Sequence, residues 1–374
     1  MVWRKRVVSA FVLILAIVMT GCSDAPPPNK TGGKGGGGKA AGKRFILLTN
    51  GNSPFWDAAR VGLEEGAKDL KLTDSGITAV MEVNDGTPGG QISKLRQFAT
   101  QPDIIGVAVS ALDADNAQVV AEMKNLRKKG VHVITVDADV NRDKFRDARE
   151  FYIGTDNFKG GQALGICGKG LLESRGKKAG SYVQFVGRTG SDNAIKRMNG
   201  FKSKVGDNFK EADRMGDDLD KTKARDNVRN ALTNHKDIVA LVGIWSYNAP
   251  AIVDVVEENK VRDQVTIVTF DAEPVAIKQM AEGKIDAMVV QNPYDMGYQS
   301  MKLLKAMVEK DKSTISKMFP NQGKKDGDIF NTGLKVVVAS DKSPLKADMF
   351  AEGTEFMLLS KFQEWLKKYS LEGS

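Results

Sequence analysis

Polar residues that can form several hydrogen bonds recur where short apolar runs of the chain end. If these runs are parallel β-strands, their carboxyl ends lie at one edge of a sheet, and the side chains that follow them converge on one crevice. A carboxylate there can accept hydrogen bonds from two adjacent hydroxyl groups, which is chemistry that suits a polyhydroxylated small molecule. A single Asp in this position can equally be a helix cap or a turn residue, but four polar strand ends together favour a binding crevice. These candidate ligand-binding residues are Ser110, Asp137, Asp271 and Gln291.

Two adjacent aromatic residues lie just beyond the first apolar run, in the segment Thr49-Asn50-Gly51-Asn52-Ser53-Pro54-Phe55-Trp56. The pattern predicts that Ser53 caps a helix and that Pro54 fits its first turn. Phe55 and Trp56 then stand at the opening of this helix, beside a strand end. Because aromatic rings can stack against the C–H face of a sugar, the segment suggests a carbohydrate site.

A helix is predicted to follow the run 181–186, with Ser191 or Asp192 as its cap. Asn193 and Arg197 are four residues apart on this helix and therefore share one face, from which Arg197 can reach the crevice. A solvent-exposed Arg197 is the alternative.

Trp245 and Tyr247 lie between the apolar run 238–243 and the next predicted helix. Loops of this kind are usually exposed, so we expect Trp245 to face the ligand rather than the core. For Tyr247 the choice between core and ligand stays open.

The remaining patterns offer no metal, cofactor or catalytic centre. The spacing Asp137-x-Asp139-x-Asn141-x-Asp143 resembles the start of a calcium loop, but Arg142 replaces the turn Gly and Ala148 the closing Glu. Two His and two Cys, far apart in sequence, do not form the cluster that zinc needs. No Ser-His-Asp or Cys-His set is discernible. We therefore expect a protein that is not an enzyme and uses no cofactor, with Cys167 as a small buried apolar residue.

The charge of the chain is concentrated at its beginning. Of the net charge of +8, residues 1–44 contribute +7, which leaves the rest of the chain nearly neutral. A nearly neutral body gives no reason to expect binding to nucleic acid.

The first residues have the pattern of an export signal. Arg4-Lys5-Arg6 precedes an apolar run of about a dozen residues, too short to span a bilayer comfortably. Met19-Thr20-Gly21-Cys22 resembles a bacterial lipobox, in which the cysteine receives a lipid; an uncleaved anchor or an ordinary signal peptide is the alternative. We expect residues 1–21 to be a lipoprotein signal peptide, Cys22 to carry the lipid anchor, and residues 22–43, rich in Gly, Pro and Lys, to be a flexible tether. The protein is then exported and held at a membrane in the periplasm.

From residue 45 onward, short apolar runs alternate with amphipathic segments, which predicts an α/β fold with doubly wound parallel sheets. About nine strands in 300 residues indicate two Rossmann-like lobes. A last helix, 355–369, is expected to dock against this body. The predicted strands are 45–49, 78–83, 104–109, 131–136, 181–186, 238–243, 265–269, 286–290 and 334–339.

The chain resembles the bacterial periplasmic sugar-binding proteins of ABC importers, of the ribose-binding type, which share a sugar-binding fold with the LacI-like repressors. The resemblance covers residues 44 to about 339. Each motif is weak alone, but six occur in the same order. They are Asn52-Ser53-Pro54-Phe55-Trp56, Val133-Ile134-Thr135-Val136-Asp137, Gly154-Thr155-Asp156-Asn157 with Gly160-Gly161, Arg197-x-x-Gly200-Phe201, Thr269-Phe270-Asp271 and Gln291.

The resemblance implies roles for several of the candidates. Phe55 and Trp56 would sandwich a sugar ring, and its hydroxyl groups would bond to Thr49, Asp137, Arg197, Asp271 and Gln291. It also implies two lobes, 44–155 plus 292–333 and 156–291 plus 334–374, joined by a hinge that the chain crosses three times. The partners would be a sugar or polyol and the ABC permease subunits in the membrane, with the protein itself a monomer.

Three positions depart from the ribose-binding pattern: Ser53 stands where that family has Asn, Ala138 where it has Arg, and Trp245 where it has Asn. These changes remove polar contacts and add an indole, so we expect a ligand with a larger nonpolar face than ribose. A sensor that presents the sugar to a membrane kinase or chemoreceptor is the main alternative to an import receptor. A transcription repressor is disfavoured by the export signal, and a sugar-cleaving enzyme by the lack of a catalytic set.

Overall fold

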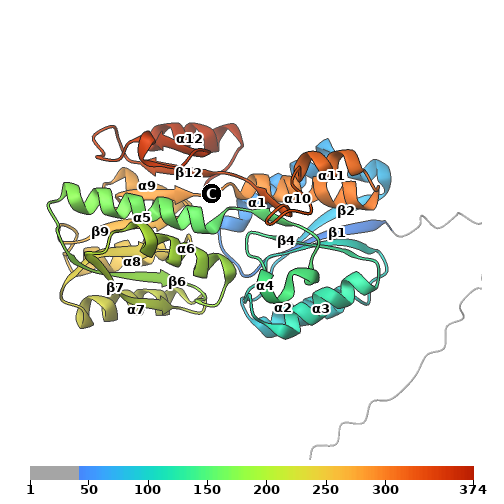
Figure 1. Cartoon of the computed structure of the whole chain (residues 1–374), viewed down its shortest axis with the longest axis horizontal. Coiled ribbons are helices and arrows are strands. Elements are labelled where there is room, and N and C mark those ends of the chain that lie inside the picture. Colours follow the sequence, from blue (N-terminus) through green and yellow to red (C-terminus); the bar gives the residue numbers. More distant parts are fainter. Residues whose placement is uncertain (1–41) are drawn as a thin grey trace, which may run out of the picture. The chain divides into compact units, whose positions relative to one another are not determined.

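The computed structural model describes residues 42–374, which form one compact unit containing two β-sheets with helices on both faces of each (Figure 1). The predicted signal peptide, the lipid attachment site Cys22 and nearly all of the predicted tether lie outside the described residues.

The first sheet has six strands in the order β11-β5-β4-β3-β1-β2, and every neighbouring pair is parallel. Helices α1 and α10 pack on one face, with α11 beside them, and α2 and α3 cover the other. The strands are β1 (Lys43–Leu48), β2 (Ile77–Glu82), β3 (Ile104–Val109), β4 (His132–Val136), β5 (Tyr152–Gly154) and β11 (Ile329–Asn331). The helices are α1 (Phe55–Asp69), α2 (Pro88–Phe98), α3 (Ala117–Lys128), α4 (Arg142–Phe145), α10 (Pro293–Val308) and α11 (Lys312–Met318).

The second sheet has seven strands in the order β13-β12-β10-β9-β8-β6-β7. Its pairs are parallel except β10 with β12, which is antiparallel. Helices α5 and α6 cover one face, and α7, α8, α9 and α12 the other. The strands are β6 (Gly180–Val186), β7 (Phe209–Gly216), β8 (Ile238–Gly243), β9 (Thr266–Phe270), β10 (Ala287–Val290), β12 (Leu334–Val338) and β13 (Thr354–Leu358). The helices are α5 (Asn157–Ser174), α6 (Asp192–Lys204), α7 (Lys221–Asn234), α8 (Asn248–Glu258), α9 (Pro274–Ala281) and α12 (Leu359–Lys368).

The chain passes from one sheet to the other three times: between β5 and β6, between β10 and β11, and between β11 and β12. This arrangement confirms the predicted α/β fold with two doubly wound sheets. The division into lobes at the residues given above stays a prediction.

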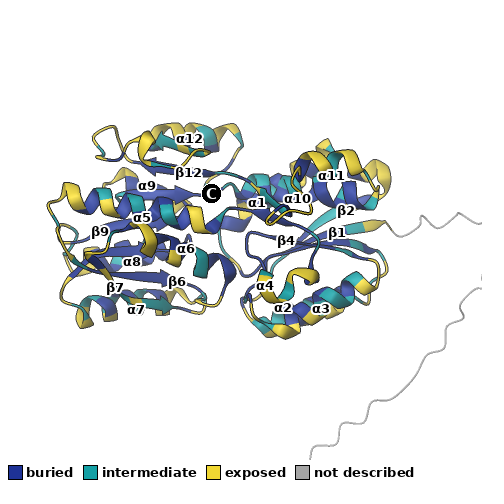
Figure 2. Cartoon of the chain, viewed as in Figure 1, coloured by how far each residue is buried: buried dark blue, intermediate teal, exposed yellow. Residues whose placement is uncertain are grey.

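Burial follows the sheet arrangement (Figure 2). The central strand β8 is buried along its whole length, and β3 is buried except at the partly buried Ile105, as expected for parallel strands that helices cover on both faces. Cys167 of α5 is fully buried, and burial raises the pKa of its thiol. Among the described residues, no helix is long and apolar enough to cross a membrane.

Two local predictions were wrong, and a third was right only in the position of the residue. The predicted helix 355–369 begins only at Leu359, because the preceding residues form β13, which pairs with β12 along its full length. Ser53 does not cap α1: Pro54 occupies the cap position and no side chain caps the helix. Ser191 is the N-cap residue of α6, as predicted, but its hydroxyl donates to the Leu112 carbonyl oxygen and not to the helix.

Candidate ligand-binding site

Seven of the ten predicted ligand-binding residues line one small pocket between the two sheets, with a cavity of about 30 Å³. Three of these seven follow the ends of β4, β8 and β9, and four lie in the N-terminal parts of α1 and α6, all at the carboxyl ends of the parallel strands. They are Phe55, Trp56, Asp137, Asn193, Arg197, Trp245 and Asp271.

Aromatic rings form the apolar part of this pocket. Phe55 and Trp56 pack edge to face, with ring centres 5.0 Å apart at 90°. The Trp56 Nε1 donates to Asn50 Oδ1 at 3.3 Å, and the Trp245 Nε1 donates to Asn193 Oδ1 at 3.2 Å. Each indole is therefore held by a polar neighbour while its ring faces the cavity. Trp245 is buried, so its connecting segment is not the exposed loop that the sequence predicted.

Asp137 and Asp271 form the polar part of the pocket. Each comes directly after a strand and adopts a left-handed backbone conformation, with φ of 62° and 65°, which Asp tolerates better than most residues. This turn of the backbone ends the strand and directs both carboxylates toward the same guanidinium. Arg197 Nη2 lies 3.6 Å from Asp137 Oδ1, and Nη1 lies 3.5 Å from Asp271 Oδ2.

Several contacts hold the Arg197 side chain in place. It lies on α6 against α5, where Gly161 permits close contact: a Cβ at Gly161 would lie 2.1 Å from the Arg197 carbonyl oxygen. Nε donates to Asn157 Oδ1 at 2.9 Å and Nη1 to the Ile244 carbonyl oxygen at 3.1 Å. The guanidinium carbon lies 4.0 Å from the centre of the Phe270 ring. The side chain is thus buried and pre-positioned, not solvent-exposed as in the alternative.

Burial disfavours the charged form of both carboxyl groups. Burial raises the pKa of Asp137, although Arg197 and hydrogen bonds from Ser110 and Asn193 oppose the shift. Burial raises the pKa of Asp271 to about 6, against the attraction of Arg197 and a hydrogen bond from Gln291. Two buried carboxyl groups thus share one buried guanidinium, and its attraction only partly offsets the effect of burial on their pKa values.

Thr49, Ser110 and Gln291 do not line the pocket, and the structure gives them supporting contacts instead. The Thr49 hydroxyl donates to the Gly51 carbonyl oxygen at 2.8 Å and accepts from the Asn84 backbone N–H at 3.0 Å. Ser110 Oγ donates to Asp137 Oδ2 at 3.2 Å. Gln291 Nε2 donates to both Asp271 carboxylate oxygens, at 3.0 and 3.3 Å. Ser110 and Gln291 therefore orient the two carboxylates from behind.

Two buried polar atoms at the site have no hydrogen-bond partner: Arg197 Nη2 and Gln291 Oε1. Buried polar groups usually have a hydrogen-bond partner, so an unpaired one needs an explanation. Arg197 Nη2 is therefore a free donor at the pocket, as binding of a hydroxyl-bearing molecule requires, whereas Gln291 Oε1 lies behind Asp271 and does not line the pocket.

Six further residues line the pocket: Asn50, Gly51, Ser53, Leu219, Ser246 and Tyr247. Asn50, Gly51 and Ser53 belong to the segment that the sequence singled out, and Ser246 and Tyr247 flank Trp245. Leu219 follows β7, an edge strand whose mixed polar sequence gave no strand signal, so nothing in the sequence pointed to it.

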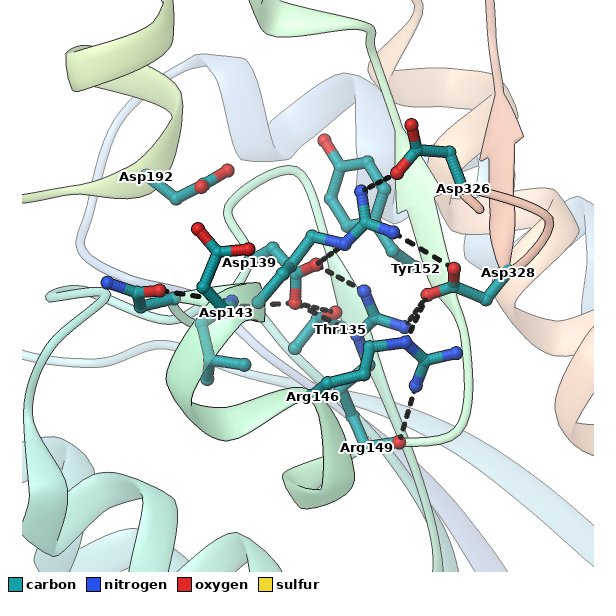
Figure 3. Close-up of polar contacts among 12 residues, drawn as sticks. Thr135, Asp139, Asp143, Arg146, Arg149, Tyr152, Asp192, Asp326 and Asp328 are labelled. Carbon is teal, nitrogen blue, oxygen red and sulfur yellow. Dashed lines mark hydrogen bonds and ion pairs between the residues drawn. The ribbon is translucent and has the colours of Figure 1, made fainter. Parts of the chain in front are cut away.

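A larger cavity of about 680 Å³ lies elsewhere, bordered by charged residues around Arg142 and Arg146. Behind it, the buried Arg149 pairs with Asp139 and Asp328 (Figure 3). Arg142 Nη2 and Arg146 Nε also reach Asp328, at 3.0 and 2.8 Å. Because these charges are paired with one another, the network is a structural brace, and the smaller pocket remains the better candidate site. Within residues 42–374, no three His, Cys, Asp or Glu side chains gather as a metal site would require.

The fold and the site together define a receptor class: two doubly wound sheets with a polar pocket between them. The family model described as "Periplasmic binding protein domain" matches residues 43–312, and the chain belongs to this family. The family resemblance inferred from the sequence is thereby confirmed.

The similarity extends over most of the length of several known proteins. The D-allose-binding periplasmic protein of Escherichia coli (strain K12) is 25% identical over 280 residues, which are 73% of this chain and 86% of that protein. The ribose import binding protein RbsB of Salmonella typhimurium is 23% identical over 268 residues, 71% of this chain and 85% of that one. Among solved structures, an ABC transporter solute-binding protein of Burkholderia graminis in complex with D-arabinose has the same fold. Its TM-score is 0.67 and its identity 21%, with 80% of this chain and 96% of that chain covered.

Proposed function

We propose that this protein binds a monosaccharide or a related polyol in the pocket between its two sheets and delivers it to an ABC permease. The observation that carries the proposal is the buried Asp137–Arg197–Asp271 cluster beside the rings of Phe55 and Trp56. Carboxylates and a guanidinium bond to ring hydroxyl groups, while the aromatic rings cover a nonpolar ring face. The names of the relatives, for D-allose and for ribose, support the same ligand class.

Sugar binding requires the walls of the pocket to move apart. A cavity of about 30 Å³ is far below the roughly 300–1,000 Å³ of ordinary small-molecule sites, so a sugar enters only when the walls separate. The three passages of the chain between the sheets form a hinge about which the two lobes, 44–155 plus 292–333 and 156–291 plus 334–374, open and close.

The proposal includes the other properties that we expect from the sequence. The exported protein is tethered to a membrane through a lipid on Cys22, acts as a monomer, and catalyses no reaction on the sugar. Trp245, in place of the Asn of ribose binders, supplies apolar surface, so the ligand has a larger nonpolar face than ribose.

Isothermal titration against a panel of pentoses, hexoses and cyclitols tests the proposal. We expect at least one hexose or cyclitol to bind more tightly than ribose, and Arg197→Met to abolish its binding. Exclusive, tight binding of ribose would refute the inference that the ligand has a larger nonpolar face than ribose, and no binding of any panel member would refute the function. Hydrolysis of chromogenic glycosides would refute the non-enzymatic role.

A further inference from the structure

Leu219 lies where the candidate pocket meets solvent. Of the thirteen lining residues, all within the described part of the chain, Leu219 and Ser53 are half-buried and the others are buried. The residues on either side of Leu219, Asp218 and Asp220, are exposed. Any part of a ligand that extends beyond the pocket must therefore leave it past Leu219 and Ser53.

The Leu219 side chain seats against two glycines of the opposite sheet's loops: Gly51, which follows β1, and Gly86, which follows β2. A Cβ at Gly51 would lie 2.3 Å from Leu219 Cδ2, and a Cβ at Gly86 would lie 3.5 Å from the same atom. Gly51 does not have a left-handed φ, so its backbone does not require glycine. Glycine fits at position 51 because any side chain there would collide with the Cδ2 methyl group of Leu219.

Hydrogen bonds hold Leu219 in a backbone conformation that leucine does not favour. Asp218 and Leu219 have φ of 58° and 64°, a left-handed conformation that a leucine rarely adopts. The buried Asp217 carboxylate fixes it by accepting from the Leu219 backbone N–H at 3.0 Å, from Asn248 Nδ2 at 2.8 Å and from the Tyr247 hydroxyl. Unfavourable backbone conformations that surrounding contacts enforce are typical of functional sites.

A polar contact accompanies the apolar one. Arg188, from the loop after β6, donates through Nη2 to the Gly86 carbonyl oxygen at 3.1 Å and pairs through Nη1 with Asp218 at 2.8 Å. The loop that carries Leu219 is thus attached to the same glycine that its side chain covers.

We propose that Leu219 sets the length of the ligand: seated on Gly51 and Gly86, it forms an apolar end wall that restricts the site to a single sugar ring. The inference rests on the proposed function. A second sugar unit or an alkyl group attached to the ring and directed to this side of the mouth would have to occupy the volume of the Leu219 side chain. The site therefore accepts free monosaccharides and rejects their glycosides.

Titration of Leu219→Ala tests the wall. The probes are the tightest-binding aldose of the panel and its methyl glycoside, beginning with D-allose and methyl β-D-allopyranoside. In the wild type we expect the glycoside to bind at least about tenfold more weakly than the aldose, and in Leu219→Ala we expect this ratio to fall about tenfold. Leu232→Ala, which truncates a partly buried leucine of α7, is the matched control and should leave the ratio unchanged.

Gly51→Ala provides an independent check, because its Cβ would displace Leu219. We expect it to weaken aldose binding about tenfold and Gly51→Ala/Leu219→Ala to restore it. Gly89→Ala, where a Cβ has nothing within 4 Å, is its control. A wild type that binds aldose and glycoside equally, or a folded Leu219→Ala with an unchanged ratio, overturns the end wall but leaves the sugar-binding function standing. A wild type that binds no sugar refutes the function itself.

Discussion

The buried carboxylate of Asp271 should destabilise the ligand-free protein, and Asp271→Asn measures the effect. Burial raises its pKa from 3.8 to about 6 in the folded protein. Between these two values the folded protein keeps a proton that the unfolded chain has released. The free energy of unfolding therefore falls as pH rises through this window, and the whole loss is present above pH 6.

The size of this loss follows from the shift. About two pKa units at roughly 1.4 kcal/mol each give about 3 kcal/mol. Asn resembles the protonated carboxyl group, so Asp271→Asn should be about 3 kcal/mol more stable than the wild type near pH 7.5 and nearly equal to it near pH 3.8. The same change removes a charged acceptor from the pocket, so we expect sugar affinity to fall at least about tenfold.

Urea unfolding without sugar, at a series of pH values between about 3.8 and 7.5, measures the difference between variant and wild type. Asp207→Asn, at an exposed aspartate, is the control and should show no such pH-dependent difference. An Asp271→Asn protein that is no more stable than the wild type near pH 7.5, or a stability difference that does not grow with pH, refutes the reasoning.

Three further changes test other parts of the structure. Arg149→Met removes the buried guanidinium that bridges Asp139 and Asp328 and should lower the free energy of unfolding by about 3–5 kcal/mol, whereas Arg146→Met, at an exposed arginine of the same network, should cost about 1 kcal/mol or less; chemical denaturation compares them, and equal losses would contradict the bracing role. Trp245→Phe removes the indole bond to Asn193 and should weaken sugar binding by about 1 kcal/mol, about fivefold by calorimetry; an unchanged affinity would show that this bond does not shape the site. Ser374→Ala removes the hydrogen bond from the Ser374 hydroxyl to the carbonyl oxygen of Gln291, and thermal unfolding should show that the free energy of unfolding falls by about 1 kcal/mol. An unchanged stability would show that this hydrogen bond does not stabilise the fold.

The sequence predicted nearly all central strands and their helices because each is a local pattern. A continuous apolar run such as β3 indicates a strand covered on both faces, and its length is set within the run itself. The strands that were missed lie at or next to sheet edges. β5 and β11 are three residues long, β7 is largely polar, and β13 was taken for the start of a helix. Such strands owe their existence to a neighbour that supplies hydrogen bonds, which no local pattern records.

For the candidate site, too, some features were predictable from the sequence and others only from the tertiary structure. The sequence alone placed Asp137 and Asp271 at strand ends and Trp56 at a helix opening, since each position follows from its own neighbours. The sequence also predicted that these side chains converge on one crevice, but only the tertiary structure decided that Gln291 stands behind a carboxylate and that Leu219 contacts a glycine far away in sequence. The physical reason is that contacts between sheets depend on the packing and crossing of distant segments, whereas strands, helices and their ends depend on neighbours along the chain.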